Sequence, residues 1–350
     1  MKTCRHFAVA TVLLALVLPG VAQNDAPDGA QNNTQDSAPQ SNSQGNPPAV
    51  YTQKTEEQKG DPQPTFKVDV KLVNVYVTVT DAHGAPVGGL VKDDFRLAED
   101  GVPQDIRVFA KESELPLSIV LAVDSSLSVR TSLKLELESA RRFIHEIMRR
   151  QDALSLYQFS EQVDELVHFT SDLRTIDRGI DRVHVGSATA LFDAVFLASE
   201  ALAKRQGRKV LVVITDGGDT MSQVDYQQAL RAAQESEAII YSIIVVPIES
   251  SAGRNTGGEH ALIQFSEDTG GRYYYAKSLP ELDKVFRQIS EQLRTQYLLG
   301  FYPKARQADS DFRRLAVTLA PAPAAGGAAA DDLNQMRARH RTGYYISRPH

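Results

Sequence analysis

A carboxylate followed by hydroxyl groups at two alternate positions marks the short stretch AVDSSLSV, residues 122–129. Asp124 ends the apolar run LSIVLAV, and Ser126 and Ser128 come two and four residues later. In an extended turn, residues two apart project the same way, so both hydroxyls can face one ion. Helix N-caps are also rich in Asp and Ser, so helix capping is the favoured explanation of this stretch when it is taken alone.

Two further loops carry the same kind of oxygen donor. The segment GSATALFDAV places Thr189 at the head of a helix, and VVITDGGDT places Asp216 at the end of a strand. If the loops meet at one edge of a sheet, they gather two carboxylates and three hydroxyls. An all-oxygen set of this kind suits Mg²⁺, with Mn²⁺ or Ca²⁺ as alternatives, rather than zinc.

The elements that must position these loops are predicted by alternation. Residues 115–294 alternate short, branched apolar runs with amphipathic stretches such as SLKLELESARRFIHEIMRR and ELDKVFRQISEQLRTQ. Such alternation predicts an α/β fold, in which a doubly wound, mostly parallel sheet has helices on both faces. The two strongest central strands then end in Asp124 and Asp216, at the edge where ligands bind in open parallel sheets.

These motifs resemble the von Willebrand factor type A domain with its metal-ion-dependent adhesion site. The family pattern D-x-S-x-S, then Thr, then Asp is matched in order by Asp124, Ser126, Ser128, Thr189 and Asp216. The resemblance implies that the three hydroxyls bind the metal directly, Thr189 in the ligand-competent state, and that the two carboxylates act largely through water. It also implies that a carboxylate of a partner protein completes the coordination, and that the sheet has one antiparallel edge strand, expected at YQFS, residues 157–160.

A narrower similarity is to exported bacterial proteins of the acidobacterial type that carry such a domain between flanking segments. It rests on VNVYVTVTDAHGAPVGGLVKDDFRLAEDG before the domain, and on EDTGGRYYYA and LRTQYLLGFYP at its end. The sequence departs from that group in a polar insert, ESSAGRNTGGEH, residues 249–260. We interpret the insert as a tolerated surface loop, with modification of the binding rim as the alternative.

The flanking segments predict a small β-module. In residues 66–112, alternating valines with a following turn predict one strand, and two further short strands are expected around residues 99–103. Three strands are expected in residues 295–350, in QYLLGFYP, FRRLAVTL and MRARHRTGYYIS. Because each end alone is thin, we expect the C-terminal extension to pack with residues 66–112, the alternative being two independent β-extensions.

The N-terminal residues are typical of an exported protein. Residues 1–22 read as a cleaved signal peptide, and residues 23–65 as a disordered polar linker. Cys4 precedes the apolar run, so no lipid anchor is expected, and no later stretch predicts a membrane span in the mature chain. Loss of Lys2 and Arg5 changes the formal charge of the 350-residue chain from −6 to −8, which gives no support to nucleic-acid binding. We therefore expect a secreted or periplasmic protein.

The sequence favours binding over catalysis. It contains no G-x-S-x-G, G-x-x-x-x-G-K-[ST] or H-E-x-x-H motif. His145 and His168 are interpreted as structural or surface residues, and Asp193 as a residue that orients the Thr189 loop or the helix entry. The expected function is Mg²⁺-dependent recognition of an acidic residue on a protein partner. The alternatives are a scaffold subunit of a pilus, secretion or chelatase-like assembly and, less favoured, a metal-dependent hydrolase. The oligomeric state has no sequence signal.

Overall fold

The structure is a computed structural model that describes residues 72–111, 115–246, 256–304, 311–319 and 335–346. The signal peptide and polar linker predicted for residues 1–65 lie outside these ranges. None of the helices in the described ranges is long and apolar enough to cross a membrane.

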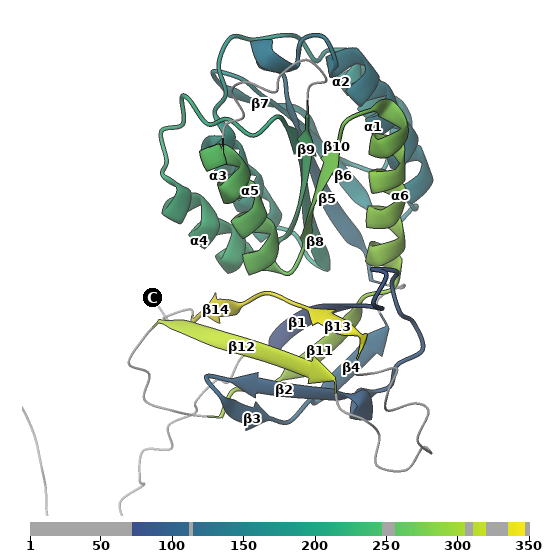
Figure 1. The fold of residues 1–350 in the computed structure, drawn as a ribbon, viewed down its shortest axis with the longest axis vertical. Coiled ribbons are helices and arrows are strands. Elements are labelled where there is room, and N and C mark those ends of the chain that lie inside the picture. The colour runs from purple at the N-terminus through teal and green to yellow at the C-terminus, as the bar shows by residue number, and fades with distance from the viewer. Residues whose placement is uncertain (1–71, 112–114, 247–255, 305–310, 320–334, 347–350) are drawn as a thin grey trace, which may run out of the picture. The chain divides into compact units, whose positions relative to one another are not determined.

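A six-stranded sheet forms the centre of the fold, in the order β10–β9–β8–β5–β6–β7 (Figure 1). Five strands are parallel, and the sixth, β7, pairs antiparallel with β6 at the edge. The predicted doubly wound, mostly parallel α/β fold is thereby confirmed. The strands are β5 (Leu117–Asp124), β6 (Ala153–Phe159), β7 (Val163–Thr170), β8 (Arg208–Thr215), β9 (Ile239–Val245) and β10 (Arg272–Ala276).

The expected position of the antiparallel strand at residues 157–160 is wrong. Those residues belong to the end of β6, which is parallel to β5, and to the turn after it. β6 is buried along nearly its whole length, as an interior strand must be, whereas β7 contains three exposed residues and one fully buried residue. Exposed residues within VDELVHFT are the signal of an edge strand with one face in water.

Helices cover both faces of the sheet (Figure 1). Helices α1, α2 and α6 pack on one face, where the core includes Ile119, Phe143 and Phe286. Helices α3, α4 and α5 pack on the other, around Val120, Leu191 and Phe265. Successive residues of β5 thus enter different cores, which explains its unbroken apolar sequence. The helices are α1 (Leu133–Ile147), α2 (Leu173–Ile180), α3 (Leu191–Ala203), α4 (Tyr226–Ser236), α5 (Thr256–Thr269) and α6 (Leu279–Arg294).

Two four-stranded sheets combine strands from both flanking segments. One has the order β13–β1–β11–β4 and the other β14–β12–β2–β3. A shared apolar core, which includes Val75, Phe95 and Leu299, lies between their strands. The strands are β1 (Val73–Thr80), β2 (Phe95–Glu99), β3 (Val102–Gln104), β4 (Val108–Lys111), β11 (Tyr297–Phe301), β12 (Phe312–Leu319), β13 (Arg337–Arg339) and β14 (Gly343–Tyr345).

The strand count of this module differs from the expectation at two places. Residues 95–111 form three strands instead of two, because Asp100 and Gly101 adopt positive φ angles and make a tight hairpin between β2 and β3. The segment MRARHRTGYYIS forms two short strands instead of one, and they join different sheets. β13 pairs with β1, and β14 pairs with β12.

Arg341 links the module to the edge of the central sheet at which the parallel strands begin. Its side chain is 7% exposed. Its guanidinium donates to the carbonyl oxygen of Asn74, which lies on β1, and to Glu237, which precedes β9. Next to it, the backbone N–H of Thr342 donates to the carbonyl oxygen of Asp268 on α5. The opposite edge of the sheet, where the strands end, therefore stays clear of these contacts.

Candidate metal site

Three loops meet at the edge where the parallel strands end. The backbone N–H of Gly186, in the second loop, donates to the carbonyl oxygen of Ser125 in the first across 2.7 Å. The N–H groups of Thr220 and Met221, in the third loop, donate to the carbonyl oxygen of Thr189 in the second across 2.8 and 3.1 Å. The three segments that carry the predicted ligands are therefore joined through their backbones.

Asp124 is the most deeply buried of the predicted ligands, with 0% of its surface exposed. Its Oδ1 accepts from the backbone N–H of Ser126 across 2.8 Å, and its Oδ2 accepts from the Thr215 hydroxyl across 2.6 Å. Burial raises the pKa of Asp124 to about 6; these hydrogen bonds oppose the rise, and the nearby charge of Asp216 adds to it. The structure thus fixes the orientation of this carboxylate and leaves its charge without a cationic partner.

Ser126 and Ser128 place their hydroxyl oxygens 2.9 Å apart. Ser126 is buried, and Ser128 is exposed on the 3₁₀ turn Leu127–Val129. Ser126 occupies the N-cap position of that turn, but its side chain makes no capping hydrogen bond. For Ser126 the geometry therefore gives no support to helix capping. The two hydroxyl oxygens are close enough together to be ligands of the same ion.

Thr189 and Asp216 complete the predicted set. Thr189 is 5% exposed, and its backbone N–H donates to the Thr220 hydroxyl across 3.0 Å. Asp216 directly follows β8, is partly buried, and lies close enough to Asp124 for its charge to raise the pKa of Asp124. Thr189 and Asp216 therefore lie at the edge that holds Asp124 and the serine pair.

The chemistry of this donor set fits a hard divalent cation. Two carboxylates and three hydroxyls supply only oxygen, and they leave coordination positions for water or a ligand. Among the described residues, no three His, Cys, Asp or Glu side chains cluster as a metal site. An ion at this edge would therefore depend on the hydroxyls, as the D-x-S-x-S spacing predicts.

Two residues near the site were missed by the sequence reasoning. Thr215 holds Asp124 by its hydroxyl, and its position beside Asp216 at the end of VVIT was the available signal. Glu136, on the first turn of α1, is 2% exposed, and its pKa is raised to about 7, chiefly by burial. No sequence pattern marks it, because LKLELE presents its two glutamates alike.

Asp193 supports the third loop rather than the metal set itself. Its carboxylate accepts from the backbone N–H groups of Gln223 and Val224 at 2.9 to 3.0 Å. Asp219 and Ser222 add contacts to the start of α3, through the N–H of Phe192. The loop that begins at Asp216 is thereby tied to the helix that follows Thr189.

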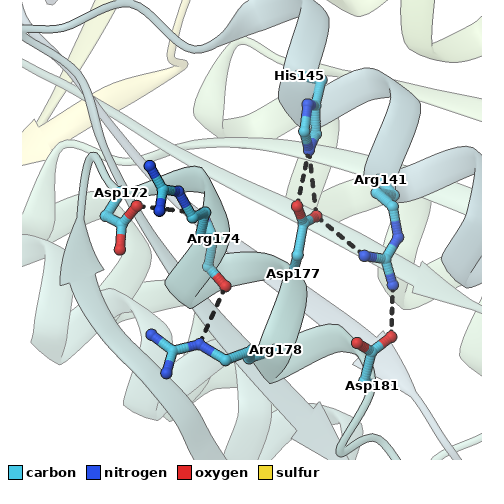
Figure 2. A network of polar contacts seen from close by, with 7 residues as sticks. All are labelled: Arg141, His145, Asp172, Arg174, Asp177, Arg178 and Asp181. Atoms are coloured by element: carbon cyan, nitrogen blue, oxygen red, sulfur yellow. Dashed lines mark hydrogen bonds and ion pairs between the residues drawn. The ribbon is translucent and has the colours of Figure 1, made fainter.

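His145 lies in a polar network between α1 and α2. Figure 2 shows its imidazole facing Asp177, with Nε2 3.1 Å from both carboxylate oxygens. Arg141 bridges Asp177 and Asp181 from the same helix. His168 is exposed and pairs with Glu165 on the same strand.

Helix α5 begins inside the segment interpreted as a polar insert, so that interpretation is wrong for its second half. Residues 256–260 form the first turn of α5, and residues 247–255 lie outside the described ranges. Gly258 packs against the turn after Asp216 so closely that a Cβ would lie 1.2 Å from the carbonyl oxygen of Gly217. The glycine at position 258 is therefore explained by a close backbone approach beside the third loop.

Comparison with known proteins finds similarity over part of the chain. Residues 119–218 match the model of the von Willebrand factor type A domain. An uncharacterized protein of Borreliella burgdorferi is 25% identical over 177 residues, which cover 45% of this chain and 52% of the relative. The matched region thus spans about half the length of that relative.

Solved structures with a similar arrangement include three bacterial proteins. BatB of Bacteroides thetaiotaomicron is 18% identical and covers 51% of this chain and 100% of its own, with a TM-score of 0.41. A von Willebrand factor type A protein of Catenulispora acidiphila is 10% identical over 74% and 72%, with a TM-score of 0.45. The domain of the pili tip protein Mfa5 of Porphyromonas gingivalis is 12% identical over 51% and 94%, with a TM-score of 0.42.

Proposed function

We propose that this protein binds a protein partner through a divalent cation held at the strand-end edge, as the match of residues 119–218 to the model of the von Willebrand factor type A domain supports. The observation that carries the proposal is the fixed, buried carboxylate of Asp124 beside two hydroxyl oxygens that lie 2.9 Å apart. We propose Mg²⁺ as the ion, because every donor in the set is a hard oxygen.

Each residue of the set has a distinct part in this proposal. Ser126, Ser128 and Thr189 offer hydroxyl oxygens to the cation, and Asp124 and Asp216 supply negative charge and accept hydrogen bonds from its bound water. The cation, when bound, supplies the positive charge that attracts an acidic side chain of the partner. Thr215 and Asp193 keep the first and third loops in place, through the hydrogen bonds already described.

The proposal also covers where the protein is located and whether it catalyses a reaction. The signal-like residues 1–22 support export, and we propose a secreted or periplasmic protein that binds without catalysing a reaction. The purified protein is then expected to show no Mg²⁺-dependent hydrolysis of ester, peptide or phosphoester substrates. Turnover that disappears in Ser126→Ala/Ser128→Ala would favour the hydrolase alternative instead.

A capture experiment tests the function. The mature chain, immobilised and exposed to solubilised envelope of the native cell, should retain a partner in millimolar Mg²⁺ and release it in EDTA. The variant Ser126→Ala/Ser128→Ala should retain none. Ser171→Ala, which changes an exposed serine beyond β7 at the opposite edge of the sheet, should behave as wild type.

The result separates adhesion from a scaffold role. Loss of the partner in both EDTA and the double variant supports cation-dependent recognition. A partner captured equally with Mg²⁺, with EDTA and by the double variant would overturn the proposal and favour a scaffold subunit that docks through another surface.

A further inference from the structure

Glu136 is a buried acid close to the candidate metal site. It projects from the first turn of α1 and is 2% exposed. Neither of its carboxylate oxygens forms a hydrogen bond of normal geometry with a described residue. The hydroxyl of Ser132, one turn earlier, donates to the carbonyl oxygen of Val129. Burying a carboxylate in this way is costly unless something compensates its charge.

The charged groups that act on Glu136 are all acidic. Asp124 and Asp216 both raise its pKa, in addition to the dominant effect of burial. Within the described ranges, no ion pair joins any of these three carboxylates to a lysine, arginine or histidine. Asp124, Asp216 and Glu136 thus repel one another near the strand-end edge, and none of them is paired with a cationic side chain of the described residues.

A cavity connects Glu136 to Ser128, one of the five candidate ligands. It has a volume of about 440 Å³ and lies between the start of α1, the ends of β9 and β10, and the start of α6. Ser128 and Glu136 both line it, and Lys277 lines it from the loop before α6. Glu136 therefore shares a wall with one of the two hydroxyls that face the proposed ion.

We propose that Glu136 supports the cation site from outside the ligand set. Its carboxylate does not touch the ion but supplies a third negative charge, which increases the affinity for a divalent cation. This inference rests on the proposed function, since it requires a cation at the five-residue set. Outer groups around a metal commonly tune its affinity in this manner. The bound cation in turn compensates a buried charge that the folded chain leaves uncompensated.

A purely structural role of Glu136 predicts different effects on cation affinity and on metal-free stability. If Glu136 only filled space, a neutral side chain of similar size would leave cation affinity unchanged. If it serves the cation, the same change weakens binding and relieves repulsion in the metal-free protein. Affinity and metal-free stability then move in opposite directions, which loss of packing alone does not produce.

The test compares four forms of the mature chain: wild type, Glu136→Gln, Glu136→Asp and Glu138→Gln. Glu138 is the exposed glutamate two residues further along α1 and serves as the matched control. Mg²⁺ binding is measured by titration calorimetry at pH 7.5, and metal-free stability by thermal melting in EDTA. Glu136→Gln should bind Mg²⁺ roughly tenfold more weakly or worse, and should melt in EDTA at the wild-type temperature or higher.

The remaining forms separate charge from shape. Glu136→Asp, which keeps the charge, should recover most of the affinity, and Glu138→Gln should match wild type. Equal Mg²⁺ affinity in wild type and Glu136→Gln would overturn this inference and leave the cation site intact. A lower melting temperature of Glu136→Gln in EDTA would also overturn it, because the side chain would then be structural. Absence of Mg²⁺ binding in wild type would instead overturn the proposed function itself.

Discussion

The Thr215 hydroxyl donates a hydrogen bond of 2.6 Å to Oδ2 of Asp124, across the ends of two neighbouring parallel strands. The same hydroxyl oxygen accepts from the backbone N–H of Gly217 across 3.1 Å. One side chain therefore holds the carboxylate of the first loop and the turn of the third. The two loops that supply both acids of the candidate site are positioned by this residue.

Replacing Thr215 by valine should separate this hydrogen bonding from packing. Thr215→Val keeps the shape but removes both bonds, and it leaves the Asp124 carboxylate and the Gly217 N–H buried without them. We expect a loss of about 2 to 3 kcal/mol in the free energy of unfolding, measured by urea denaturation at pH 7.5. Thr215→Ser, which keeps the hydroxyl, should lose about 1 kcal/mol or less. Equal stability of Thr215→Val and wild type would show that these bonds contribute nothing.

Mg²⁺ should stabilise the metal-free protein. At free Mg²⁺ about tenfold above the dissociation constant, binding adds roughly 1.4 kcal/mol, or on the order of 3 to 6 °C in Tm. Ser126→Ala/Ser128→Ala should abolish the shift and leave the fold intact. Asp216→Asn should abolish it as well, with equal or slightly higher stability in EDTA, because one of the three repelling acids is removed. If the serines and acids only capped helices, wild type would show no Mg²⁺ shift, and each lost cap would cost roughly 1 kcal/mol.

The sheet was predictable because its signals are local. The central strands β5 and β8 are apolar runs that lead into polar loops, and helix-like stretches follow them, so the order of strands and helices follows from the alternation. The edge strand was misplaced because YQFS and VDELVHFT both contain strand-forming residues. Only pairing decides which is interior: Leu156, on β6, pairs with Leu121 on one side and with Val167 on the other.

The site was predictable only for residues that a motif names. Asp124, Ser126 and Ser128 share one loop, so their spacing carries the information. Glu136 and Gly258 depend on contacts made after folding: one is buried by the way α1 lies on the sheet, and the other by the approach of α5 to Gly217. Such contacts between distant segments leave no periodic trace in a single sequence.

Ionisation of Asp124 and Glu136 should reduce the stability of the metal-free protein as the pH rises from about 4 to about 7. The pKa of Asp124 is raised from 3.8 to about 6, and that of Glu136 from 4.5 to about 7. The unfolded chain loses these protons first, so the folded state is favoured most below pH 4 as far as these two groups are concerned. Ionisation of Glu136 alone costs on the order of 3 kcal/mol by pH 7.5.

Urea denaturation of wild type and Glu136→Gln in EDTA, at several pH values between 4 and 7.5, measures this contribution. The difference in stability between the two proteins should grow with pH in favour of the variant. A constant difference across the range would contradict the raised pKa. Glu138→Gln provides the control, because that side chain is exposed.

Removal of the C-terminal segment should destabilise the N-terminal strands. A chain that ends at Arg294 lacks β11, which pairs with both β1 and β4, and β12, which pairs with β2. Val75 and Val77, both 0% exposed, would then lose the strand beside them. We expect lower solubility and rapid proteolytic cleavage within residues 72–111. Mass spectrometry of the fragments over time measures the cleavage. Full protection of these residues in the truncated protein would show that the N-terminal strands fold without the C-terminal ones.

Gly258→Ala should disturb the third loop from a helix outside the ligand set. The new methyl group would lie 1.2 Å from the carbonyl oxygen of Gly217, so either α5 or the turn after Asp216 must move. Gly217 has a φ of +100°, a backbone conformation that glycine adopts readily and other residues rarely do. Overpacking of this kind costs typically about 1 to 3 kcal/mol, and displacement of the turn should also reduce the rise in Tm on adding Mg²⁺.

Gly88→Ala is the control, because nothing lies within 4 Å of its added methyl group. Melting curves of both variants with Mg²⁺ and with EDTA decide the matter. A Gly258→Ala protein that keeps the wild-type Tm and the wild-type Mg²⁺ shift would show that the start of α5 does not hold the Asp216 loop.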